Sequence, residues 1–223
     1  MFTTPAENSP PTDPAAVVDL LGMLAYGQLL AFDRLAADAR LAPDLRRRAL
    51  LSEMAAAEIG SYRRVVHRLA ELGADPSAAM APFAGPLEEY HDSTEPRDWL
   101  EALTKAYVGD GLADDFFREV AGFLGPPDGE LVLRVLHDSD YDRFARDEIR
   151  AAIEADPKVA NRLSMWARRL VGEGLSQAQR VASERPPLTA LLLAGADSGG
   201  IQGLFRRLTT AHTARMAAVG LNN

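Results

Sequence analysis

The fold class is decided by the stretch HDSDYDRFARDE, residues 137–148. Its core DSDYD, residues 138–142, begins like a calcium-binding loop with acids at alternate positions. Such a loop also needs a glycine at its sixth position and a bidentate glutamate at its twelfth. Arg143 and Ile149 stand at those positions. Because the stretch also continues a helical apolar period, the sequence predicts a helix with inward-facing acids and no calcium loop.

The composition limits the classes of function. The chain has 223 residues, 47% hydrophobic content and a formal net charge of −8, enough for one sizeable core. A protein that wraps nucleic acid is usually basic, so the charge argues against a nucleic-acid partner. The absence of cysteine excludes disulfides, thiolate metal sites and a cysteine nucleophile.

No targeting or membrane segment is expected. Residues 1–13 are rich in proline and lack the basic and apolar regions of a signal peptide, so they are predicted to be a disordered lead-in. We find no apolar run of the roughly 18 residues that a membrane span needs. We therefore expect a cytoplasmic protein that does not enter a membrane.

Apolar residues recur at helical spacing along most of the chain, and strand signals are nearly absent. The periodicity predicts six helices, over residues 14–41, 44–73, 97–124, 129–155, 158–185 and 198–219. Short loops within the first two pairs favour antiparallel neighbours, and residues 74–96 join the pairs. The prediction is an all-α single domain over residues 14–223. It consists of a four-helix bundle (14–155) with one crossover and two additional C-terminal helices. Their apolar faces either cover the bundle or form a homodimer interface.

Each predicted bundle helix carries polar residues within its apolar stripe. These are Gln28 in the first helix, Glu58 and Ser61 in the second, Asp110 and Asp114 in the third, and Asp138 and Asp142 in the fourth, with Tyr141 on the flank. All lie near helix midpoints, which meet at one level in an antiparallel bundle. Burying an unpaired carboxylate costs several kcal/mol. The acids of this layer must therefore be protonated, paired with arginine, hydrated or bound to a cation.

The chain resembles a known family along nearly its whole length from Leu20 onward. YVGDGLADDF and GEGLSQAQR, in this order, are the most specific of the matching stretches. The family is that of the ferritin-like proteins related to the tRNA hydroxylase MiaE, in their actinobacterial-type branch. The resemblance implies a ferritin-like bundle with a di-iron site whose ligands are glutamates and Glu-x-x-His pairs. It also implies oxygen-dependent hydroxylation with tRNA as the substrate.

Carried over residue by residue, the resemblance implies a degenerate di-iron site. Gln28 stands where the family has a glutamate, and Ser61 and Tyr141 stand where it has the two histidines. Glu58 and Asp138 match acids of the family. Asp114 is the better match to the third-helix acid, with Asp110 as the alternative.

Two functions remain open at this point. We favour a non-catalytic bundle, without a bound metal, that serves binding or assembly, because both histidines and one bridging-type acid are missing. The alternative is an oxygen-dependent hydroxylase with an altered carboxylate-rich site. Glu58, Asp110, Asp114, Asp138 and Asp142, with Tyr141 as a further ligand, would then hold iron or manganese. An alternative interpretation of Asp110 is that it caps a local bend at Gly109 or Gly111.

Overall fold

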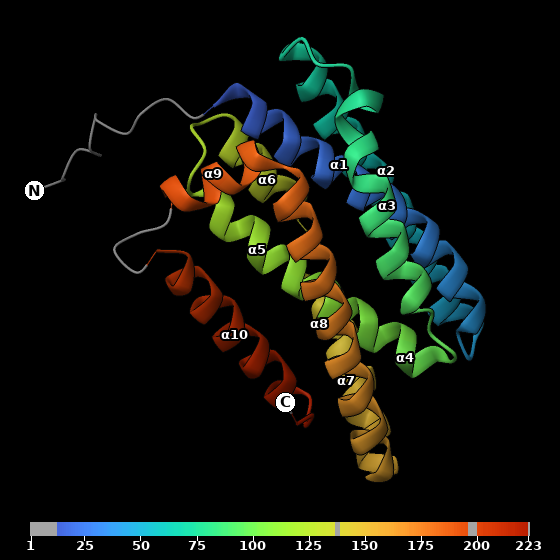
Figure 1. The fold of residues 1–223 in the computed structure, drawn as a ribbon. Helices are drawn as coiled ribbons and strands as arrows, with labels where there is room; N and C mark the ends of the chain where they lie inside the picture. The colour runs from blue at the N-terminus through green and yellow to red at the C-terminus, as the bar shows by residue number, and fades with distance from the viewer. Residues whose placement is uncertain (1–12, 137–138, 196–199, 223) are drawn as a thin grey trace, which may run out of the picture.

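The computed structural model describes residues 13–136, 139–195 and 200–222. Helices make up nearly all of these ranges, and no strand occurs within them (Figure 1). The elements are α1 (Pro14–Asp38), η1 (Ala39–Leu41), α2 (Leu45–Glu71), α3 (Pro76–Ser93), α4 (Trp99–Thr104), η2 (Lys105–Asp110), α5 (Gly111–Ala121), α6 (Asp128–Val135), α7 (Ser139–Ala155), α8 (Lys158–Glu184), α9 (Pro186–Gly195) and α10 (Gly200–Ala218). The short element η1 is a 3₁₀ turn, and η2 is a π-helical turn. The predicted all-α helical bundle is confirmed.

The helices pack in pairs. Helices α1 and α2 make a hairpin, while α5 lies beside α6 and α4 beside α7 (Figure 1). Helix α3 packs on α1 and α8. Local signals explain how the first pair begins. Asp13 accepts a hydrogen bond from the Ala15 amide at 2.9 Å ahead of Pro14, and Asp44 accepts one from the Arg47 amide at 2.9 Å. Both are N-caps, which satisfy amides that the first helical turn leaves free.

The segment 14–41 is, among the described residues, the one helical stretch long and apolar enough to cross a membrane by length and composition. From the sequence alone we predicted no such run. More than half of its apolar window is buried inside the protein. Leu20 and Leu21 are fully buried, and the core cluster around them draws on α2, α3, α6 and α9. This burial is what the central helix of a bundle requires.

The crossover from residue 74 to 96, for which the sequence predicted no helix, contains helix α3. Pro82 and Pro86 suggested a break because an internal proline removes a helical hydrogen bond, yet both lie within the helix. Ala79, Phe83 and Pro86 share its buried face, and Phe83 is completely buried. Packing against α1 and α8 therefore outweighs the intrinsic cost of the two prolines. Asp75 accepts a hydrogen bond from the Ala78 amide at 2.8 Å and marks the true helix start.

Two other boundaries also differ from the prediction. The expected helix 129–155 is divided, because Leu136 adopts an extended conformation after α6 and α7 begins at Ser139. The segment after Pro186 was expected to break the helical pattern, but it forms helix α9. Its prolines occupy the first helical turn, where a missing amide costs nothing.

Helices α8 and α10 cover the bundle, which resolves one alternative that the sequence left open. The buried residues on their apolar faces are Leu163, Trp166, Leu170, Leu204 and Met216. Trp166 Nε1 donates a hydrogen bond to the Glu101 carbonyl at 3.0 Å and ties α8 to α4. These residues are buried against the same chain and therefore do not test the homodimer, which remains a prediction.

The contact between α1 and α3 depends on Gly22. A Cβ at this position would overlap the backbone carbonyl of Ala79. We expect Gly22→Ala to lower the free energy of unfolding by about 1–3 kcal/mol, the usual cost of overpacking. Gly172→Ala in α8 is the control, because nothing lies within 4 Å of its added Cβ, and it should stabilise by up to about 1 kcal/mol. Urea denaturation measures both, and equal effects would contradict this close contact.

Candidate functional site

Of the polar residues predicted to face the core, those that the structure describes lie inside the bundle or at its edge. The buried ones are Gln28, Glu58, Ser61 and Tyr141. The half-buried ones are Asp110, Asp114 and Asp142. Asp138 lies outside the described residues. Among the described histidines, aspartates and glutamates, no group of three or more is close enough to hold a metal ion.

An arginine that the sequence analysis did not single out lies at the centre of this layer. Arg34 of α1 is only 8% exposed. Its Nη2 donates a hydrogen bond to Asp110 Oδ2, and its Nη1 lies 3.7 Å from Asp38 Oδ2. It also donates to the Tyr141 hydroxyl. One guanidinium thus links α1 to the π-helical turn and to α7. We call Arg34, Asp38, Asp110 and Tyr141 the arginine cluster.

Asp110 does not cap a bend, which was the other reading of its position. It precedes α5, but its side chain makes no capping hydrogen bond. Its carboxylate turns to Arg34 instead. A buried guanidinium needs a paired anion, and Asp110 meets this need from the facing helix.

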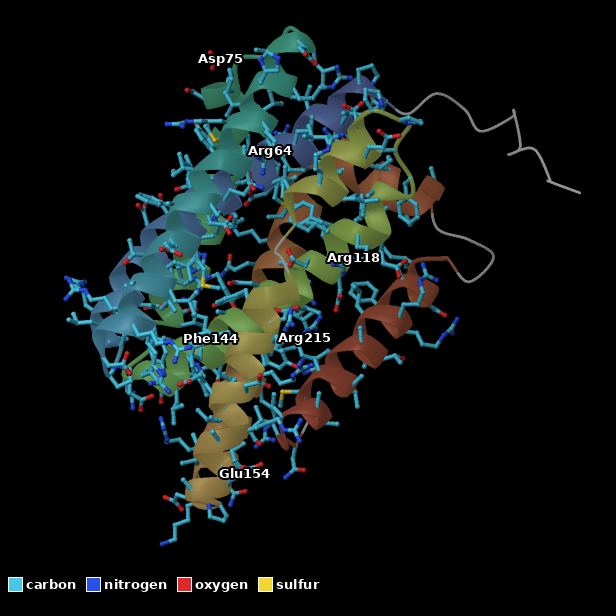
Figure 2. All side chains as sticks on the ribbon, turned by 180° about the vertical axis from the view of Figure 1, so that it is seen from behind. Arg64, Asp75, Arg118, Phe144, Glu154 and Arg215 are labelled. Atoms are coloured by element: carbon cyan, nitrogen blue, oxygen red, sulfur yellow. The ribbon has the colours of Figure 1, made fainter. Side chains whose placement is uncertain are left out.

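The neighbouring polar residues have partners of their own. Gln28 Nε2 is 3.4 Å from the Val135 carbonyl, at the end of α6. Ser61 accepts a hydrogen bond from Arg64 Nη2 at 3.0 Å, and Arg64 lies one turn further along α2 (Figure 2). Asp142 lies near Tyr107, whose pKa is raised by burial and by this carboxylate. Tyr141 contacts the arginine cluster instead, so the neighbouring residues Tyr141 and Asp142 serve different parts of the site.

The π-helical turn η2 places a second buried cation beside the arginine cluster. Lys105 is 1% exposed. Its Nζ donates to the carbonyl of Thr94 at 2.8 Å and to that of His91 at 3.4 Å, at the end of α3. A cation at a helix C-terminus satisfies carbonyls that the helix leaves free and interacts favourably with the helix dipole. Lys105 therefore fastens α3 to η2.

Gly109 in the same turn has no side chain, which leaves room for the Tyr90 hydroxyl. A Cβ on Gly109 would come within 2.6 Å of the Tyr90 hydroxyl. Lys105 Nζ also lies 5.5 Å from the centre of the Tyr90 ring, a cation–π distance. Single π-helical turns often occur at functional sites. Here the turn brings Lys105 and Asp110 onto the arginine cluster from one element.

Burial shifts the pKa values of the site strongly. It lowers the pKa of Lys105 to about 8, with Arg34 contributing, and that of His91 to about 2, with Lys105 and Arg34 contributing. Burial also raises the pKa of Tyr141, although Arg34 opposes the shift. For Arg34 itself burial lowers the pKa, but Asp110, Tyr141 and Asp38 outweigh it and raise the pKa overall. At neutral pH the site therefore holds two cations, neutral tyrosine and neutral histidine.

A pocket of about 480 Å³ opens beside the arginine cluster, at the C-terminal ends of α1 and α3. Arg34, Asp38 and Lys105 line it from the buried side. The sequence did contain a signal for the first two. Counted from Ala31, the α1 stripe follows an i, i+3, i+4, i+7 pattern that includes both Arg34 and Asp38. The position of Lys105 depends on the π-helical turn, which the periodicity does not reveal.

We expect the Arg34–Asp110 contact to be strongly cooperative. Arg34→Met should lower the free energy of unfolding by about 3–5 kcal/mol, because Asp110 loses its cation. Asp110→Asn in the same chain should recover part of the loss, with a coupling of about 0.5–3 kcal/mol. Urea denaturation of the wild type, the two single variants and the double variant measures it. The exposed pair Arg180–Glu89 serves as control and should couple less. Additive effects at Arg34 and Asp110 would refute the pairing.

The lowered pKa of Lys105 should appear in the pH dependence of stability. Between about pH 8 and pH 10.5 the unfolded chain retains the Lys105 proton that the folded chain has released, so stability rises with pH. The wild type should gain about 1.4 kcal/mol per pH unit relative to Lys105→Met. Comparing the two proteins cancels other titrating groups, and urea denaturation across this window provides the values. Parallel curves would show that Lys105 titrates normally.

A sequence model described as the ferritin-like domain of actinomycetes matches residues 12–195. The match spans the helices from α1 to α9 and therefore includes the whole arginine cluster, while α10 lies beyond it. No curated protein matches the chain. Since the match covers well over half of the 223 residues, this chain belongs to the ferritin-like domain family of actinomycetes.

Proposed function

We propose that this chain is a non-catalytic ferritin-like protein that serves binding or assembly. In this proposal a guanidinium neutralises its core acid in place of a metal. The ion pair between Arg34 and Asp110 carries the proposal. Arginine stays charged at every physiological pH, and its planar fork suits a carboxylate. Asp110 is a candidate for the third-helix metal ligand, so its pairing removes an anion from any metal site there.

The remaining donor set also fits a di-iron centre poorly. Such centres draw a glutamate from each of two helices and a Glu-x-x-His pair from each of two others. Ser61 and Gln28 stand at two of these ligand positions. Ser61 accepts a hydrogen bond from Arg64, and Gln28 donates one to the Val135 carbonyl. Tyr141 is buried with a raised pKa, so it presents a neutral phenol. Oxygen chemistry at this site is therefore not part of the proposed function.

One observation favours the alternative, an altered metal-dependent hydroxylase. Gln28 Oε1 is buried without a hydrogen-bond partner in the structure, and Glu58 is buried on the neighbouring helix α2. Amide and carboxylate oxygens are ligands for hard cations. The hydroxylase alternative implies tRNA as the substrate, and free arginines on the surface would favour such a polyanion. Several surface arginines are instead paired with acids. Arg47 pairs with Glu148 and Asp44, and Arg207 pairs with Glu119.

Metal content discriminates between the two functions. Protein produced without an affinity tag in medium supplemented with iron and manganese should contain far less than one metal ion per chain, because a fixed cation already lies in the layer. Elemental analysis measures this. Stoichiometric metal that is lost in Glu58→Gln and retained in Glu53→Gln would overturn the proposal. Glu53 is a matched control, since it lies exposed on the same helix.

A further inference from the structure

The pocket beside the arginine cluster has a sharply divided charge distribution. Its buried side presents the cations Arg34 and Lys105, together with Asp38. Its exposed rim carries three acids against the single cation Arg40. The rim acids are Asp33, Asp92 and Glu95. Leu30 and Pro96, both partly buried, add apolar surface to the lining. The pocket is thus positive inside and negative at its mouth.

Polar atoms on the buried side have hydrogen-bonding capacity to spare. Arg34 Nε and Nη1 and Asp38 Oδ2 are buried without a hydrogen-bond partner in the structure. The side chains of Arg34 and Asp38 are each only 6% exposed, and both line the pocket. Leaving such groups unsatisfied destabilises the folded chain, and the cost is larger for charged groups. A ligand that brings an acceptor to Arg34 recovers part of this cost.

We propose that this pocket binds a small zwitterion, with its carboxylate toward Arg34 and Lys105 and its ammonium toward Asp33, Asp92 and Glu95. A guanidinium accepts a carboxylate through parallel N–H donors, and the rim acids attract the cationic end. A simple anion meets repulsion at the rim, and a simple cation meets repulsion at the buried end. The inference rests on the proposed function in one respect, namely that arginine and not a metal lies at the inner wall.

Asp38 does not oppose this arrangement. Burial raises the pKa of Asp38, against the influence of Arg34 and Lys105. Its protonated form is therefore favoured when a second carboxylate approaches, as in carboxyl pairs that share a proton. The protonated form also supplies a hydrogen-bond donor to the incoming group.

The test uses the full chain and a series of amino acids with terminal charges: 4-aminobutanoate, 6-aminohexanoate and 8-aminooctanoate. Amide chemical shifts in NMR titrations give both affinity and location. We expect saturable shifts at residues 91–96 with at least one of the three compounds. The best binder should bind roughly tenfold more tightly than the alkanoate or alkylamine of equal length, since each lacks one of the two charge contacts. Equal affinity for the alkanoate would overturn the zwitterion and leave a plain anion site.

Rim variants separate binding from folding. Asp92→Asn/Glu95→Gln changes exposed side chains only, so the protein should fold normally while zwitterion affinity falls about threefold or more and alkanoate affinity does not fall. Glu53→Gln/Glu130→Gln removes the same charge from exposed positions elsewhere and should leave zwitterion affinity unchanged. Equal losses in both double variants would refute the rim contact.

The two proposals fail in distinguishable ways. If metal-free protein shows no saturable shift with any of the three compounds, the pocket inference is wrong and the metal-free bundle stands. If elemental analysis finds stoichiometric metal bound through Glu58, the proposed function is wrong whatever the titration shows. Binding by the metal-free chain supports both.

Discussion

The ion pair between Arg34 and Asp110 sets the constraint that the site must satisfy. A guanidinium on the buried face of α1 is tolerable only if anions and acceptors surround it. The structure supplies them from separate elements, with Asp38 from α1 itself, Asp110 from η2 and Tyr141 from α7. The relative positions of α1, η2 and α7 are therefore coupled through one side chain. Any shift of one helix along its axis would leave a charge without its partner.

Local backbone irregularities make this convergence possible. The π-helical turn η2 lies in the middle of what would otherwise be one long helix, and it carries Lys105, Gly109 and Asp110. The missing side chain of Gly109 admits Tyr90, and Lys105 fastens the end of α3. Helix α3, in which packing offsets the cost of two internal prolines, is also held at both ends, by the Asp75 cap and by Lys105. The irregular turn and the proline-containing helix thus depend on each other.

Sequence periodicity predicted the long regular helices well and the irregular ones poorly. α1, α2, α8 and α10 end within a few residues of their predicted bounds, because amphipathic spacing and capping residues signal them directly. Helix α3 was missed because proline propensity was weighed without the burial of Phe83, which only tertiary packing provides. The division between α6 and α7 was missed because the apolar period continues across Leu136 although its backbone is extended.

The sequence likewise revealed only some residues of the site. Gln28, Glu58 and Ser61 stand out in the sequence because each interrupts an apolar stripe, and Tyr141 lies on the flank of one. All four are buried. Arg34 was overlooked, although it continues the α1 stripe, because the charged end of an arginine usually extends to solvent. Its role becomes visible only when the facing acid is placed. Sequence periodicity shows where polarity enters a core, but it does not show which opposite charge meets it.

Replacing a metal by a guanidinium preserves a bundle but not its chemistry. Arginine can neutralise an acid and connect helices, as a bound cation does, and it stays charged without any supply of metal. It offers donors only and has no open coordination position at which oxygen could bind. The acids of the layer can therefore remain useful to the fold after metal chemistry is lost, so their presence alone does not indicate catalysis. What distinguishes the two cases is the partner of each carboxylate, and for Asp110 that partner is Arg34.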